Sequence, residues 1–224
     1  MDALLAFAAA LLALRLAGEL ARRYRARRAP QLAAWAASLL AYALASAALA
    51  WGAASGWDEA TFRVYYLFGG LLTAPLLGVG SLLLAGRSWA APLGLLYTGV
   101  AVGLALAEPL TSPVRGESIP EAQEHLEFVP ARMVAVLGNS LGTLAVVAVA
   151  LLTLRRRPAG NALILAGVAV AAAGSGLAGL GVAETAVFVA AAAVLLYLGF
   201  VAGPGYSPIA LRTTRLRRRP SNSA

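Results

Sequence analysis

Two side chains whose types and spacing suit metal binding are Glu121 and His125, which lie four residues apart. This spacing brings two side chains to one face of a helix, where a carboxylate and an imidazole can share a divalent ion. Two ligands do not close a site, and the chain has no cysteine to complete one. The alternative is a solvated acidic helix without a metal. We therefore expect no cofactor, and Glu121 and His125 are the candidate ligands if a metal binds.

Hydrolytic catalysis usually needs paired carboxylates, or a nucleophile beside a base. The single histidine lies in an expected loop, the apolar segments contain almost no ionisable groups, and cysteine and lysine are both absent. Disulfides, thiol nucleophiles and Schiff-base chemistry are therefore excluded. An intramembrane enzyme is the least favoured function class.

A small-ligand site is the other chemistry that the residues allow. Pro75 has no backbone N–H, so the carbonyl one turn earlier, near Leu71, needs another donor. Thr73, Ser140 and Thr143 are the donors expected at that depth. Such groups either bond between helices or bind a ligand, and both interpretations remain. The candidate site residues are Thr73, Pro75, Tyr97, Asn139, Ser140 and Thr143.

The composition indicates which elements must position these residues. The chain is 60% hydrophobic and 12% charged, against about 45–50% and about 25% in globular domains. A membrane-spanning helix needs about 20 apolar residues, so the 224 residues accommodate seven spans and no soluble domain. We predict an all-α polytopic integral membrane protein of seven transmembrane helices. The expected helices are residues 3–20, 31–52, 62–85, 89–107, 131–154, 161–180 and 184–203.

The long loop at residues 108–130 is expected to be external and to contain a short amphipathic helix. Ser118 precedes Glu121 by three residues, as in a capping box. One helical face of this segment would carry Ile119, Ala122, Leu126 and Val129.

The arginines predict orientation, because cytoplasmic loops of membrane proteins carry an excess of basic residues. If the chain forms seven spans, 14 of the 18 arginines lie on one side of the membrane and nine of the ten acidic residues lie on the other side or at helix ends facing it. The amino terminus should therefore lie outside, and residues 205–224 should form a basic cytoplasmic tail at a bacterial inner membrane. An anionic-lipid or nucleic-acid patch is the less favoured interpretation of this tail, and we expect no nucleic-acid partner. The topology-setting arginines are Arg22, Arg23, Arg25, Arg27, Arg28, Arg155, Arg156 and Arg157.

Proline spacing indicates a parallel internal repeat. Pro30 and Pro75 are 45 residues apart, and Pro158 and Pro204 are 46 apart. Each pair encloses two apolar runs and an outer turn with an acid near a threonine, which suggests a 3+1+3 plan. Basic inner loops arise in any membrane protein, so a duplication and a coincidence both remain.

This plan resembles two families. It is similar to the microbial rhodopsins in its seven helices and outer amino terminus, but a chain without lysine cannot bind retinal as they do, and no retinal is expected. It resembles the SWEET sugar transporters in the 3+1+3 plan, although their Pro-Gln signature is missing from the spans and Pro30-Gln31 lies in the first inner loop.

The first three segments look like the seven-helix sensor regions of bacterial histidine kinases and like uncharacterised actinobacterial membrane proteins. The resemblance rests on the arginine loop, the Trp-rich second segment and the run WDEATFRVYYLFGGLLTAP at residues 57–75. It implies a receptor-like module.

Three function classes follow. The first is a non-enzymatic membrane module, either a receptor-like small-ligand binder or an accessory subunit of a membrane complex. The second is a transporter of an uncharged small molecule built on parallel three-helix repeats, and the third is an intramembrane enzyme. A water-accessible cavity at mid-depth would separate the first two. The expected partners are the lipid bilayer and a membrane protein or second copy; the GxxxG patterns do not establish a dimer.

Overall fold

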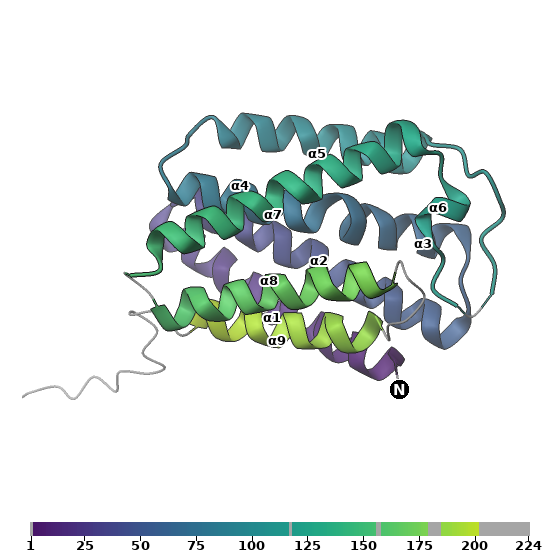
Figure 1. The fold of residues 1–224 in the computed structure, drawn as a ribbon, viewed down its shortest axis with the longest axis horizontal. Coiled ribbons are helices and arrows are strands. Elements are labelled where there is room, and N and C mark those ends of the chain that lie inside the picture. The colour runs from purple at the N-terminus through teal and green to yellow at the C-terminus, as the bar shows by residue number, and fades with distance from the viewer. Residues whose placement is uncertain (1, 117, 156–157, 179–184, 202–224) are drawn as a thin grey trace, which may run out of the picture.

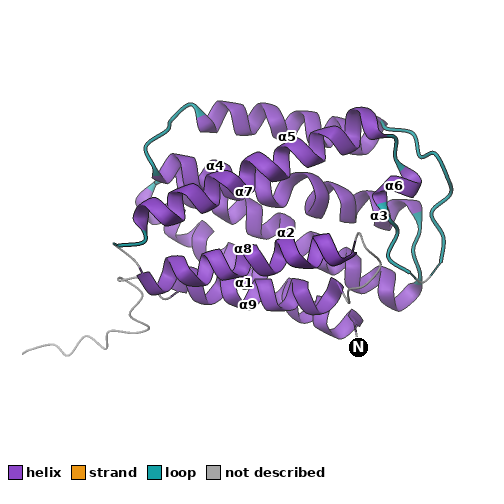
Figure 2. Cartoon of the chain, viewed as in Figure 1, coloured by secondary structure: helices purple, strands orange, loops and turns teal. Residues whose placement is uncertain are grey.

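The computed structural model describes residues 2–116, 118–155, 158–178 and 185–201, and within these ranges the chain is helical and contains no β-strand (Figures 1 and 2). Five helical stretches have the length and apolar composition of membrane-spanning helices. The prediction of an all-α protein with apolar helices suited to a lipid bilayer is confirmed. The five stretches are Ala3–Arg27, Pro30–Ser55, Glu59–Leu84, Ala90–Ala107 and Phe128–Thr153.

The first two helices are longer than predicted. Helix α1 (Asp2–Arg27) continues beyond the expected end at residue 20 and carries four of the topology-setting arginines in its last turns. Arginine is a good helix former and its charge is favourable at a helix C-terminus, so a basic run need not end a helix. The turn comes at Arg28, which has a φ of 52°. Helix α2 (Pro30–Ser55) then begins with proline in its first turn, where no N–H is required.

The third span is interrupted by a wide turn. It consists of α3 (Glu59–Tyr65), the π-helical η1 (Tyr66–Leu72) and α4 (Thr73–Leu84). Asp58 caps α3, because its carboxylate accepts a 2.7 Å hydrogen bond from the Thr61 backbone N–H, which lowers the pKa of Asp58. The sequence predicted one proline-kinked helix over 62–85, and the structure adds the π-helical turn just before Pro75.

The remaining helices coincide with the other predicted segments. The fourth and fifth segments correspond to α5 and to η2 continued by α7, while the sixth and seventh correspond to α8 and α9. Arg156, Arg157, residues 179–184 and the tail at 205–224 lie outside the described residues. The bounds are α5 (Ala90–Ala107), α6 (Ala122–His125), η2 (Phe128–Arg132), α7 (Met133–Thr153), α8 (Pro158–Ala178) and α9 (Thr185–Val201).

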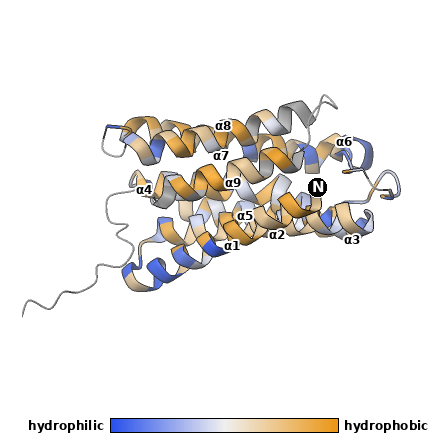
Figure 3. Cartoon of the chain, turned by 90° about the horizontal axis from the view of Figure 1, so that it is seen from below, coloured by the Kyte–Doolittle hydropathy of each residue, from blue (hydrophilic) through white to orange (hydrophobic). Residues whose placement is uncertain are grey.

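The helices pack side by side in a bundle with polar ends. Helix α1 packs against α2, α8 packs against α9, and α9 also contacts α1. Helix α4 contacts both α2 and α7, whereas α5 lies at the periphery against α4 and η1 and is the least buried of the five candidate spans (Figure 1). Hydrophilic residues gather toward the two ends of the bundle and hydrophobic ones between them (Figure 3).

The loop between α5 and α7 is packed onto one end of the bundle. Val114 and Leu126 are buried against Trp57 and Phe62, and the Trp57 backbone N–H donates to the Gly116 carbonyl at 2.7 Å. The arginine pattern predicts that this end faces outside, and we call it, with the loop that covers it, the outer end.

The short helix predicted in this loop is present but begins later. It starts after Glu121, no side chain caps it, and Ser118 is not its N-cap, so the capping-box prediction is wrong. Glu121, the second member of the predicted box, has an extended backbone with a ψ of 128°, so the box is not formed. The end of the helix is joined to the first part of the loop, because the Thr111 N–H donates to the His125 carbonyl at 2.9 Å. Of the predicted apolar face, Leu126 is buried but Val129 is 57% exposed.

Candidate functional site

Three of the predicted site residues converge on the π-helical turn of the third span. The Asn139 amide in α7 donates to the Gly70 carbonyl at 2.7 Å, and the Tyr97 hydroxyl in α5 donates to the Leu71 carbonyl at 2.9 Å. The Thr73 hydroxyl donates to the Phe68 carbonyl at 2.7 Å. Side chains from two neighbouring helices and from the span itself thus hold the carbonyls that the irregular turn exposes.

The need for these donors follows from the backbone. A π-helical turn and a proline both disturb the regular i→i−4 ladder, and an unpaired carbonyl in hydrocarbon costs several kcal/mol. We call these side-chain donors, with the carbonyls that they bind, the polar layer. Sequence reasoning missed one of its members, Ser38 in α2, whose hydroxyl donates to the Thr73 carbonyl at 2.7 Å. Ser38 is only 1% exposed. A serine within an alanine-rich apolar segment was the available signal.

The donor to the Leu71 carbonyl is Tyr97 and not, as predicted, Thr73, Ser140 or Thr143. Gly138 makes this possible, since a Cβ at that position would lie 2.6 Å from the Tyr97 ring carbon that bears the hydroxyl. Ser140 is exposed on α7.

Below this polar layer the third and fifth spans are in backbone contact. A Cβ at Gly78 in α4 would lie 2.6 Å from the Gly142 Cα in α7. A Cβ at Gly142 would lie 2.8 Å from the Pro75 Cα. The third and fifth spans are therefore direct neighbours, and the region around Pro75 is filled by backbone.

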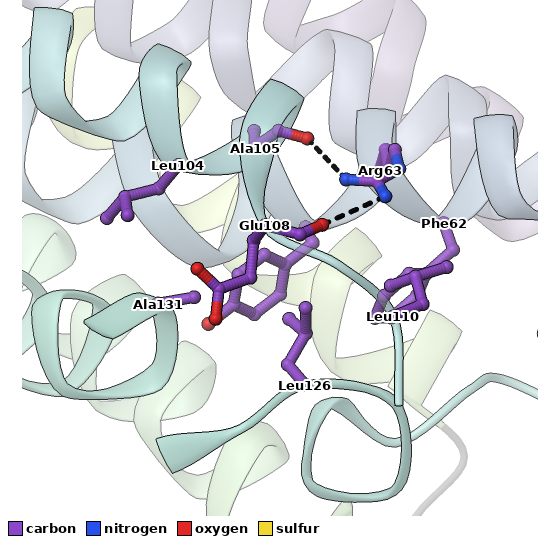
Figure 4. Close-up of a pocket in the computed structure, with 9 residues that line it drawn as sticks. Phe62, Arg63, Leu104, Ala105, Glu108, Leu110, Leu126 and Ala131 are labelled. Carbon is purple, nitrogen blue, oxygen red and sulfur yellow. Dashed lines mark hydrogen bonds between the residues drawn. The ribbon is translucent and has the colours of Figure 1, made fainter. Parts of the chain in front are cut away.

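A small cavity of about 10 Å³ lies at the outer end, between the third span, the end of α5 and the covering loop (Figure 4). Arg63 secures one wall, because its guanidinium donates to the Ala105 carbonyl at 2.8 Å and the Glu108 carbonyl at 3.0 Å. The same guanidinium forms an ion pair with Glu59 at 2.9 Å. The lining residues are Phe62, Arg63, Tyr66, Leu104, Ala105, Glu108, Leu110, Leu126 and Ala131.

A second cavity, of about 30 Å³, lies at the opposite end between α2, α4, α7 and α8. Its hydroxyl and amide side chains are paired within the protein. The Asn161 amide donates to the Thr153 hydroxyl at 2.8 Å and to the Ala150 carbonyl at 3.2 Å, and the Ser81 hydroxyl donates to the Leu77 carbonyl. The hydroxyl and amide groups of this cavity therefore already have hydrogen-bond partners.

The metal-ligand candidates have other partners. His125 Nδ1 lies 2.7 Å from the Ser112 hydroxyl, and its ring meets the Phe62 ring edge-on at 5.5 Å between centroids. The Glu121 carboxylate accepts a hydrogen bond from the Gln123 amide. Glu121 precedes α6 in extended conformation, so the two candidates do not share a helical face. Across the described ranges, no three histidine or acidic side chains are grouped so as to hold a metal ion.

The arrangement separates a sealed interior from a polar outer end. At mid-depth side chains donate to the carbonyls of Phe68, Gly70, Leu71 and Thr73, and the helix backbones touch. The outer cavity, by contrast, is bordered by the carboxyl-bearing Glu108 and the phenol-bearing Tyr66. Searches against protein-family models, curated proteins and solved structures found no match for this chain.

Proposed function

We propose that this chain is a non-enzymatic integral membrane module, receptor-like toward a small ligand or serving as an accessory subunit of a membrane complex. The observation that carries the proposal is the packed break in the third span. The carbonyls of Gly70 and Leu71 are bonded to Asn139 and Tyr97, and Gly142 contacts Pro75, where a transporter would need a water-accessible cavity.

The proposal includes seven spans in a bacterial inner membrane, with the amino terminus outside. Five described helices have spanning length, and α8 and α9 supply two further apolar helices. The arginines that end α1, Arg87 between α4 and α5, and Arg155 after α7 all belong to one end of this alternating arrangement. By the positive-inside rule that end faces the cytoplasm.

A receptor-like role is favoured over a purely structural one by the outer cavity. This cavity lies at the end of the bundle opposite the topology-setting arginines. It is covered by a loop whose residues Val114 and Leu126 are buried against the bundle. A ligand arriving from outside would meet this site without entering the membrane interior.

A transporter of an uncharged small molecule is the second candidate function. The observation that favours it is the break itself, because interrupted helices near mid-depth commonly form the substrate sites of transporters. In that case the packed arrangement is one closed conformation, and a second conformation opens the layer around Thr73.

Cysteine labelling distinguishes the two candidates, since the parent chain has no cysteine. A water-soluble thiol reagent should modify the Thr73→Cys variant at least about 100-fold more slowly than Gln123→Cys, which places the thiol in the exposed outer loop. Thermal unfolding of both variants establishes that each is folded. Comparable labelling rates in the two folded variants would reveal a wet interior and favour transport.

A further inference from the structure

The outer cavity contains a polar group that the protein leaves without a partner. The Tyr66 hydroxyl oxygen is buried and forms no hydrogen bond in the described structure. A buried hydroxyl without a hydrogen-bond partner destabilises the folded state by about 1–3 kcal/mol. In native proteins such a group is normally bonded to a ligand or an ordered water. Tyr66 lines the cavity, so the missing partner belongs there.

A carboxylate lines the same cavity. Glu108 takes part in none of the ion pairs found among the described residues, which involve Glu19 and Glu59. Its backbone is held in place by Arg63, and Figure 4 shows its carboxylate turned into the space bordered by Ala131 and Leu126. The carboxylate is therefore positioned by the fold and remains available.

These groups match one ligand chemistry. A carboxylate and a phenol oxygen both accept hydrogen bonds from an ammonium group, and both line this cavity. A volume of about 10 Å³ accommodates one water-sized group. We propose that the outer cavity binds the primary ammonium group of a small amine, with Glu108 and Tyr66 as its acceptors. This assignment rests on the proposed receptor-like function.

Two arginines bear on such a ligand. Arg63 lines the cavity but is ion-paired with Glu59. Arg132 follows the lining residue Ala131 and takes part in none of the ion pairs found among the described residues. The Arg132 guanidinium lies over the Phe128 ring, 5.6 Å from its centroid. A bound ammonium group would be attracted by Glu108 and repelled by Arg132. Substitutions at these two positions must therefore change its affinity in opposite directions.

Calorimetric titration of the full chain in lipid nanodiscs with methylammonium chloride tests the proposal. We expect saturable binding, weakened at least about tenfold by Glu108→Gln and also weakened by Tyr66→Phe, because each removes an acceptor. Arg132→Gln should tighten binding. The matched control is Glu127→Gln, which removes an exposed carboxylate of the same loop outside the cavity and should leave the affinity unchanged.

Tetramethylammonium, which has no N–H donor and is too large for the cavity, should not bind. Absence of saturable methylammonium binding would mean that the cavity holds water only and would overturn the assignment. Equal weakening by Glu127→Gln and Glu108→Gln, or weakening by Arg132→Gln, would do the same. If Glu108→Gln does not fold, Tyr66→Phe and Arg132→Gln decide the question. None of these outcomes changes the labelling of Thr73→Cys, so failure of the amine site is distinguishable from failure of the proposed function.

Discussion

Replacing Gly142 by alanine is expected to lower the free energy of unfolding by about 3 kcal/mol. The new Cβ would lie 2.6 Å from the Ala74 carbonyl carbon and 2.8 Å from the Pro75 Cα. Both are backbone atoms, which cannot turn aside as a side chain does, so α4 and α7 would have to separate. Reversible unfolding in mixed detergent micelles, followed by circular dichroism, measures the change.

The matched control is Gly99→Ala in α5, where a Cβ would meet nothing within 4 Å. There the substitution should be neutral or stabilising by up to about 1 kcal/mol, because alanine favours a helix more than glycine does. An equal loss of stability in both variants would show that the α4–α7 contact is not the cause.

Removing the Tyr97 hydroxyl as Tyr97→Phe should destabilise the protein by about 2 kcal/mol, since the Leu71 carbonyl loses its 2.9 Å hydrogen bond in the membrane interior. The loss should be smaller when Pro75 is replaced by alanine. Alanine restores a backbone N–H at position 75, one helical turn after Leu71, and so supplies an alternative donor.

The experiment is a double-mutant cycle of Tyr97→Phe and Pro75→Ala, measured by the same unfolding assay. We expect a coupling energy of about 1 kcal/mol, with the double variant more stable than the sum of the single changes predicts. Tyr24→Phe, at the arginine-bearing end of α1, is the control for loss of a phenol hydroxyl. Strict additivity at Tyr97 and Pro75 would contradict the assignment of Tyr97 as the substitute donor.

The helices were predictable because each apolar run is long enough that its length and composition alone predict a membrane-spanning helix. The end of α1 was not, since arginine is compatible with both a helix and a loop, and only the turn at Arg28 decides between them. The need for a donor near Leu71 could be inferred from Pro75 alone. The identity of that donor could not, because Tyr97 reaches Leu71 through the space left by Gly138 on a third helix.

The outer cavity was also beyond sequence reasoning. Tyr66 lies in η1 and Glu108 directly follows α5, and nothing in their local patterns relates them. They line one cavity because Arg63 holds the end of α5 against the third span and because the loop carrying Leu126 packs over both. This arrangement depends on contacts between distant parts of the chain, whereas helix formation depends on neighbouring residues.

The short length of α5 has a consequence for the surrounding lipid. Its 18 residues extend about 27 Å, whereas the 26-residue stretches Pro30–Ser55 and Phe128–Thr153 extend about 39 Å. In a bilayer whose hydrocarbon core is about 30 Å thick, the peripheral α5 would present this shorter apolar height directly to the acyl chains. The hydrophobic mismatch around the protein would therefore be uneven, and lipid beside α5 would be drawn thinner than lipid beside the longer helices.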